Sequence, residues 1–258
     1  MSMLRIQWVA FNTIFQKEVR RFMRIWMQTL LPPAITMTLY FVVFGQLIGK
    51  RVGEMDGVDY MSFIVPGLIM MSVITSAYSN VSSSFFSNKF QHSVEELMVA
   101  PVHPLTMLFG YVAGGMARGI GVGIIVTLVS LYFTSLQIHN IWVVILVVVL
   151  AATVFSLGGF VNGLLATKFD DVSIVPTFFI APLTYLGGVF YSISLLPEFW
   201  QKVSLLNPIL HLVNTFRYGV LGISDINIMV ALSMLVVFVV LLTLWSLWLL
   251  NKGTGLRK

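Results

Sequence analysis

"IWVVILVVVLAATVFSLGGFVNGLL", which spans residues 141–165, contains no charged side chain. About 20 consecutive apolar residues are needed for a helix to cross the ~30 Å hydrocarbon core of a bilayer, so this stretch predicts a transmembrane helix. Apolar stretches of comparable length recur on both sides of it. The sequence therefore predicts six transmembrane helices, at residues 27–48, 60–83, 105–134, 141–165, 172–191 and 227–250.

The composition indicates an all-α integral membrane protein. Of the 258 residues, 58% are hydrophobic and 10% are charged, whereas soluble domains carry about 25% charged residues. The mean hydropathy is +0.93. The apolar stretches suit helices rather than the shorter strands of a barrel. They leave no soluble domain of useful size, so residues 1–258 are expected to form a single transmembrane domain. The chain has no cysteine, which excludes disulfides and thiolate chemistry.

Residues 2–26 are predicted to form an amphipathic helix that lies in the plane of the lipid headgroups. Basic residues occupy much of one side, and a basic helix with an aromatic stripe is typical of a membrane surface. The alternative is a helix that packs on a protein core. The apolar stripe, at three- and four-residue steps, consists of Leu4, Trp8, Phe11, Phe15, Val19, Phe22 and Trp26.

The distribution of lysine and arginine predicts the orientation in the membrane. With the N-terminus inside, ten basic residues fall on the inner side, four on the outer side, and Arg118 within a span. Because cytoplasmic loops are enriched in Lys and Arg, both termini are expected to be cytoplasmic. The net charge of +5 is thus explained by topology, and no nucleic-acid partner is expected.

The stretch "SVEELMVAPVHP", residues 93–104, lies between two of the most apolar parts of the chain. Ser93 and Glu96 match the S-x-x-E capping box, which predicts a short cytoplasmic helix, and Pro101 ends it. Its apolar face, with Val94, Leu97 and Met98, is expected to contact a protein partner. The alternative is that this face packs against the protein's own loops.

Hydroxyl side chains follow one side of span two, and they include Ser72, Thr75, Ser76 and Ser79. They either bond to their own helix and tighten packing, or line a transport path. Span five contains Pro176 and Pro182, each of which removes a helix hydrogen bond. Its candidate substrate contacts are Thr177, Phe178, Thr184 and Tyr185.

Span three carries glycines in steps of four, at 110–114 and at 115–119–123, which predicts close helix approach. Arg118 lies among them, and a charge inside a membrane is a functional candidate. Glu18, Asp170 and Asp171 are candidate partners. The alternative is that Arg118 extends to the inner headgroups.

Two segments resemble the ABC-2 type transport permeases, the membrane subunits of type V ABC exporters. "NKFQHSVEELMVAPVHPLTMLFGY", residues 88–111, is similar to the first cytoplasmic loop of that family. Glu95, Leu97 and Pro101 match its pattern, while His92-Ser93 replaces the usual Gly-Thr and Ala100 replaces a hydroxyl residue.

The second segment, "PLTYLGGVFYSISLLPEFWQKVSLLNPILHLVNTFRYGVLG" at 182–222, is similar to the end of the family's domain. The order there is a Gly-aromatic close of span five, a Leu-Pro turn with an aromatic residue, an Asn-Pro pair and then an arginine. The matching residues are Gly187, Gly188, Phe190, Tyr191, Leu196, Pro197, Trp200, Asn207, Pro208 and Arg217. Together with the N-terminal helix and the spans, the two segments extend the resemblance over nearly the whole chain. The sequence especially resembles inner-membrane permeases of two-component bacterial systems.

The resemblance implies that residues 93–101 form a coupling helix, which docks on a separate ATPase subunit. Two permease copies and two ATPase copies would make the working unit. Spans two and five would line the path at the permease dimer interface, and residues 192–226 would form a re-entrant helical hairpin on the outer side. The coupling residues implied by this match are Ser93, Val94, Glu95, Glu96, Leu97, Met98 and Pro101.

No nucleotide-binding motif is found in the chain. A Walker A loop needs G-x-x-x-x-G-K-[ST], but in "GQLIGKR", residues 45–51, the glycines are one residue too close and arginine replaces the hydroxyl residue. No cofactor or metal is expected in this chain, and ATP and magnesium would be bound by the partner ATPase. The expected function is export of an amphipathic or lipid-like substrate across the bacterial inner membrane by alternating access.

Two other classes of function remain as alternatives. An ion-coupled transporter or a channel usually needs acidic residues or histidines within its spans, and all ten acidic residues are expected in loops or at span ends. A membrane enzyme needs a nucleophile–base pair or a metal cluster. The adjacent Asp170 and Asp171 alone make neither.

Overall fold

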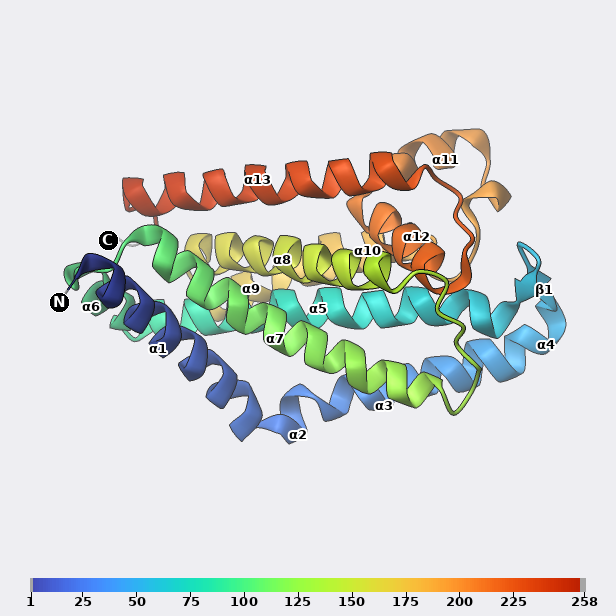
Figure 1. Cartoon of the computed structure of the whole chain (residues 1–258), viewed down its shortest axis with the longest axis horizontal. Coiled ribbons are helices and arrows are strands. Elements are labelled where there is room, and N and C mark those ends of the chain that lie inside the picture. Colours follow the sequence, from blue (N-terminus) through green and yellow to red (C-terminus); the bar gives the residue numbers. More distant parts are fainter. Residues whose placement is uncertain (1, 256–258) are drawn as a thin grey trace.

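A computed structural model of the protein describes residues 2–255, and Figure 1 shows it to be almost entirely helical. Within this range, five helical runs are long and apolar enough to cross a membrane. The first run, Trp26–Val52, consists of α2 (Trp26–Thr29), α3 (Leu31–Tyr40), η1 (Phe41–Ile48) and α4 (Gly49–Val52). The other four are α5 (Tyr60–Phe90), α7 (Pro104–Ser130), α8 (Ile141–Leu165) and α13 (Ile228–Lys252).

Shorter elements lie before, between and beside these runs. The remaining elements are α1 (Met3–Arg24), β1 (Glu54–Met55), β2 (Val58–Asp59), α6 (Ser93–Val99), α9 (Phe169–Val175), η2 (Pro176–Ile180), α10 (Ala181–Tyr185), η3 (Ile193–Leu195), α11 (Glu198–Leu205) and α12 (Pro208–Leu221). The two strands form an antiparallel hairpin in which Glu54 pairs with Asp59.

The predicted fifth span is shorter and less regular than the other five. Its helical part consists of α9, η2 and α10, with seven, five and five residues, and the chain then turns through Gly188, whose φ is +66°. Pro176 and Pro182 explain the irregularity, because proline has no N–H for the helix ladder. Five of the six predicted spans are thus confirmed as membrane-length helices. The predicted fifth span, residues 172–191, is not.

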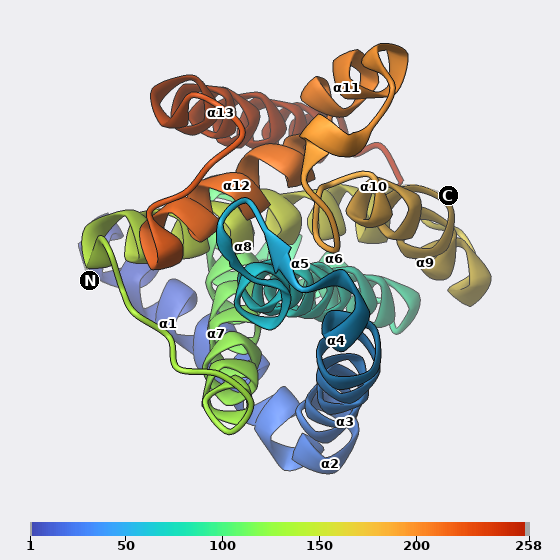
Figure 2. The same cartoon turned by 90° about the vertical axis from the view of Figure 1, so that its right-hand side faces the viewer.

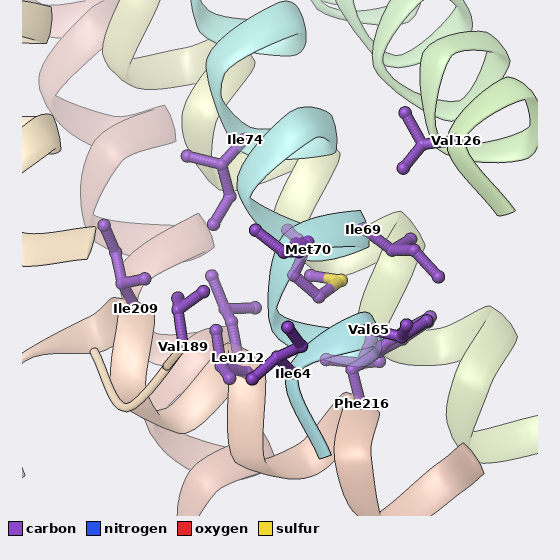
Figure 3. Packing of buried hydrophobic residues seen from close by; sticks show 14 of the residues in the cluster. Ile64, Val65, Ile69, Met70, Ile74, Val126, Val189, Ile209, Leu212 and Phe216 are labelled. Carbon is purple, nitrogen blue, oxygen red and sulfur yellow. The ribbon is translucent and has the colours of Figure 1, made fainter. Parts of the chain in front are cut away.

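Helix α5 is the centre of the molecule. Figure 2, viewed along the bundle, shows it surrounded by α7, α8, α12 and the first helical run. Figure 3 shows how Ile64, Ile69 and Met70 of α5 lie near Leu212 and Phe216 of α12 in the main hydrophobic cluster. The hydroxyl-rich helix predicted as span two is therefore an interior helix.

The glycines of α7 form two stripes that face two different helices. A Cβ atom at Gly110 would lie 2.8 Å from the Ile14 side chain of α1, and one at Gly114 would overlap Glu18. A Cβ atom at Gly119 would lie 2.8 Å from Ala77 of α5, and Gly115 and Gly123 face the same helix. The predicted close approach is confirmed on both sides of α7.

Two proline breaks leave backbone carbonyls that neighbouring helices satisfy. Thr29 has Pro32 and Pro33 at the positions that normally donate to its carbonyl, and neither has an N–H. Arg118 of α7 donates to this carbonyl at 3.4 Å. Likewise, Pro176 cannot donate to the Val172 carbonyl, which instead accepts from the Asn162 side chain of α8 at 3.0 Å. Because unsatisfied carbonyls are costly in lipid, these side chains make the breaks tolerable.

The two ends of the bundle differ in character. Helix α6 and both chain ends lie at one end, here called the α6 end, whereas the strand hairpin and α11 lie at the opposite hairpin end (Figure 1). The predicted N-terminal helix is confirmed as α1, but its buried face only partly coincides with the predicted apolar stripe. Ile14, Glu18 and Phe22 are buried, while Leu4 and Trp8 are exposed. Gly110 and Gly114 explain the difference, because they make room for Ile14 and Glu18.

Candidate functional site

Helix α6 begins differently from the prediction. His92, in the left-handed conformation with φ +59°, precedes it, so Ser93 is the first helical residue rather than the cap. Within the described residues, no side chain caps this helix, and the predicted Ser93–Glu96 capping box is wrong. Instead, the His92 ring nitrogen Nδ1 lies 2.8 Å from Glu95 Oε1. Both side chains are largely exposed, so this contact contributes little to stability.

The apolar face of α6 packs largely against this protein. Val94 is only 1% exposed and belongs to a cluster with Ile14 of α1 and Leu108 of α7, and Leu97 is half-buried against the same cluster. The side chain of Met98 lies outside the described residues. The alternative that this face packs on its own chain is therefore confirmed at Val94.

As far as its side chains are described, the outward surface of α6 is acidic with one exposed apolar side chain, that of Val99. Glu95, Glu96 and Pro101 are exposed, and Val99 is 89% exposed. A partner that approaches from the α6 end meets two carboxylates and the Val99 side chain. The sequence pattern had assigned the opposite, apolar face to that contact.

A pair formed by the buried Glu18 and the partly exposed Arg21 holds α1 against α5. The Glu18 carboxylate is fully buried and accepts a hydrogen bond from Ser84 Oγ at 2.5 Å. Arg21 donates to Glu18 Oε2 at 3.3 Å and to the Asn80 side chain at 2.8 Å. Among the described residues, no acidic side chain lies within the five membrane-length runs, as predicted, but the burial of Glu18 in α1 was not predicted. The available signal was the position of Glu18, four residues after Ile14 and four before Phe22.

Arg118 is not paired with the acidic residues considered for it in the sequence. It donates to the Thr29 carbonyl, and Glu18 bonds to Arg21 and Ser84 instead. The guanidinium thus stabilises the break between α2 and α3. This geometry supports a structural role and gives no direct sign of a substrate contact.

A cavity of about 430 Å³ lies between α5 and the α9–η2 segment. Ser79 of α5 and Thr177 of η2, both predicted for the transport path, line it together. Both sides carry hydroxyls and aromatic rings, and among the described residues no charged side chain lines the cavity. The complete lining is Ser79, Ser82, Ser83, Phe86, Phe169, Val172, Ser173, Pro176 and Thr177.

The other predicted path residues of α5 and α10 lie away from this cavity. Ser72 is buried and donates to the Ile69 carbonyl at 2.7 Å, and Thr75 donates to the Met71 carbonyl at 2.8 Å. Ser76 is buried. Thr184 is buried and donates to the Ile180 carbonyl at 2.7 Å. For Ser72, Thr75 and Thr184, bonding within the helix is the observed arrangement.

The aromatic candidates of the predicted fifth span remain on its open side. Phe178 is 70% exposed and Tyr185 is 50% exposed. Tyr185 stacks with Phe190 at a centroid distance of 6.2 Å, and Phe190 lies 4.6 Å from the Phe44 ring in the first helical run. Tyr185, Phe190 and Phe44 therefore form a partly exposed aromatic cluster between the predicted fifth span and the first helical run.

Of the two adjacent acids after α8, Asp171 bonds to the backbone of the preceding loop. Asp171 accepts from the Thr167 N–H and hydroxyl, both at 2.8 Å, and from the Lys168 N–H at 3.0 Å. The Thr167 backbone bond, then its hydroxyl and the Lys168 N–H, hold the pKa of the Asp171 carboxyl below its usual range. Residues 2–255 contain no group of three His, Cys, Asp or Glu side chains with metal-binding proximity.

Arg217 connects three parts of the hairpin end. It is almost completely buried, and it donates to the Gly188 carbonyl at 2.6 Å and to the Phe63 carbonyl at 3.3 Å. Its guanidinium also lies 3.8 Å from the centre of the Phe63 ring. A fully desolvated cation with this geometry fixes α12 to α5 and to the turn after α10.

Membrane-length helices, a short acidic helix between two of them and a hydroxyl-lined cavity together define a multi-pass membrane protein of the transport type. The chain belongs to the ABC-2 type transporter family, whose pattern it matches over residues 9–221. The recognition of this family from the two sequence segments is confirmed.

Named relatives agree with this assignment. The inner membrane transport permease YadH of Escherichia coli is 57% identical over 255 residues, which cover 99% of this chain and 100% of the relative. Nodulation protein J of Rhizobium leguminosarum bv. viciae is 24% identical over 223 residues, 83% of each chain. Nodulation protein J of Sinorhizobium fredii is 23% identical over 216 residues, 83% of this chain and 82% of the relative. The chain is thus a multi-pass inner-membrane protein of a transport permease family, and a non-enzymatic membrane subunit fits these names.

Proposed function

We propose that the protein is the permease subunit of an ATP-binding cassette exporter, driven by a separate ATPase subunit. Membership of the ABC-2 family supports an ATPase partner in general terms. The observation that carries the proposal for this chain is the outward surface of α6, where Glu95, Glu96 and Val99 are exposed at the end of the bundle. The inward packing of Val94 gives this surface a rigid connection to the spans.

The working unit is two copies of this chain with two ATPase subunits, which bind the ATP and magnesium. Residues 172–191 act as the sixth crossing segment, and α11 with α12 forms a re-entrant pair on the outer side. Both termini are cytoplasmic, which matches the bias of ten inner against four outer basic residues. The exposed basic side chains of α1 contact lipid headgroups.

The cavity between α5 and η2 is the proposed entry to the substrate path. Ser79 and Thr177 offer hydroxyls, and Phe86 and Phe169 offer apolar rings. An uncharged lining of this kind suits an amphipathic or lipid-like molecule rather than an ion. Closure of the ATPase pair moves α6, which shifts α5 relative to η2 and exposes the path alternately to the two sides.

The charge of the α6 surface provides the test. We expect Glu95→Lys combined with Glu96→Lys to abolish stable binding of the partner ATPase and the coupling of its ATP hydrolysis to the permease, because the changes reverse two exposed charges. Membrane insertion and thermal stability should remain unchanged. Glu54→Lys, an exposed change at the opposite end, is the matched control.

Co-purification and ATP hydrolysis in reconstituted vesicles are the measurements. Binding and coupled hydrolysis at the control level in the double variant would reject the assignment. The alternative is an ion-coupled transporter, which the buried Glu18 favours, although Glu18 is already bonded to Arg21 and Ser84. Transport without any ATPase subunit, and abolished by a protonophore, would favour that alternative.

A further inference from the structure

The side chain of Gln7 connects the N-terminal helix to the link between α6 and α7. Its Nε2 donates to the Pro101 carbonyl at 2.9 Å. Its Oε1 accepts from the His103 N–H at 2.9 Å and from the Thr106 hydroxyl at 2.7 Å. One residue of α1 thus makes three hydrogen bonds to a segment 94 to 99 positions away.

The chemistry of the link explains why an amide side chain suits this position. Residues 100–103 connect two helices, so the Pro101 carbonyl and the His103 N–H lie outside both helix ladders. A glutamine offers a donor and an acceptor on one planar group. A carboxylate would keep only the acceptor, and an apolar side chain would keep neither.

Further contacts fasten α1 to the same pair of helices along its length. Ile14 fits against Gly110 of α7, and the Glu18–Arg21 pair bonds to Ser84 and Asn80 of α5. Just beyond α1, Arg118 of α7 bonds to Thr29, where the first membrane-length run begins. Every one of these contacts leads to α5 or α7, the two helices that α6 joins.

We propose that Gln7 is a positioning residue that makes α1 move with α6 as one body when the partner ATPase closes. The displacement of α6 is then passed through α1 to the α2–α3 break at the start of the first span. This inference rests on the proposed function, because it needs the ATPase to move α6. It assigns α1 a mechanical task in addition to its contact with lipid.

The absence of cysteine in the chain permits a direct test by paired spin labels. The first pair is Asn12→Cys on α1 with Gln91→Cys at the junction of α5 and α6, and both positions are exposed. The second pair is Gln91→Cys with Asn251→Cys at the end of α13, also exposed. Labelled chains are diluted with unlabelled chains in the complete complex, and distances are measured without nucleotide and after trapping with ATP and vanadate.

In the otherwise unaltered protein, we expect the first distance to stay constant on trapping and the second to change. In Gln7→Ala, the first distance should broaden and shift on trapping. Gln7→Glu, which keeps two of the three bonds, should give an intermediate distribution. Gln16→Ala, on the same helix but bonded only to Asn12, is the matched control and should behave like the parent.

The outcomes separate the inference from the proposed function. A first distance that changes on trapping in the parent, or that is equally constant in Gln7→Ala, would overturn the inference while the ATPase assignment stands. Failure of every partner ATPase to bind, with neither distance responding to nucleotide, would overturn both. If Gln7→Ala and Gln16→Ala unfold at the same temperature, the change in the first distance is caused by loss of the Gln7 hydrogen bonds and not by misfolding.

Discussion

The buried guanidinium of Arg217 joins α12 to α5 and to the turn after α10 at the hairpin end. Arginine presents several N–H donors in a planar fork, so it reaches the Gly188 and Phe63 carbonyls together. Arg217→Ala should lower the free energy of unfolding by about 2–5 kcal/mol, because it leaves buried carbonyls without donors. Arg217→Lys should recover little of this loss, since an ammonium group cannot span both carbonyls. Thermal unfolding in detergent micelles measures the change.

Lys202→Ala, at an exposed position of α11, is the control and should unfold like the parent. An Arg217→Ala variant as stable as this control would show that the bonds to Gly188 and Phe63 contribute nothing. The sequence marked Arg217 by its place after the Asn-Pro pair. Its acceptors, however, are main-chain carbonyls, which no side-chain pattern identifies.

Gln7 and Glu18 show what a pattern along the sequence misses. The partners of Gln7 are 94 to 99 positions away, and Glu18 bonds to Ser84, 66 positions away. Helical periodicity assigns a residue to a face but does not say which helix covers that face. Arg118 was found because a charge within an apolar stretch is conspicuous, whereas its acceptor at Thr29 required the packed structure.

The close contact between α1 and α7 depends on glycine at one position. A Cβ atom at Gly114 would overlap Glu18, whereas at Gly121 of the same helix it would meet no described atom within 4 Å. Gly114→Ala should therefore cost about 1–3 kcal/mol through overpacking. Gly121→Ala should be neutral or stabilising by up to ~1 kcal/mol, because alanine favours the helix. Thermal unfolding of the two variants side by side decides the point, and equal stability would contradict the contact.

Helices were predicted well where hydropathy alone determines them. Five spans were placed correctly because a run of about 20 apolar residues has few stable alternatives to a helix in a bilayer. The helix ends were less accurate, since α5 continues to Phe90, seven residues beyond the predicted end of span two at 83. Those residues include Ser87, Asn88 and Lys89, which lower the hydropathy without ending the helix. The segment at 172–191 differed because its two prolines shorten and bend it.

The candidate site was predicted in part. Ser79 and Thr177 were both predicted to line a transport path, and in the structure both line the same cavity. It also assigned Val94 to the partner surface, but Ile14 and Leu108 cover that side chain. An apolar face on a short helix can be covered by its own chain or by another protein, and the sequence does not distinguish these cases.

The arrangement of the two ends gives a prediction for the complete protein in cells. Because the chain has no cysteine, single cysteines can be added without background. Glu54→Cys, on the strand hairpin, should react with a membrane-impermeant maleimide added outside the inner membrane of spheroplasts. Val99→Cys and Arg5→Cys, at the α6 end, should react only after the membrane is permeabilised. Labelling in the reverse order would contradict the proposed orientation.

The carbonyls released by the prolines have a consequence for how this protein tolerates substitution. Pro176 makes the Asn162 amide important, because the residue that would donate to the Val172 carbonyl in a regular α-helix has no N–H. If residue 176 regained an N–H, Asn162 would become dispensable, and the same holds for Arg118 and residue 33. We therefore expect each proline and its remote donor to be energetically coupled, so that a substitution at one position changes the loss of stability caused by a substitution at the other.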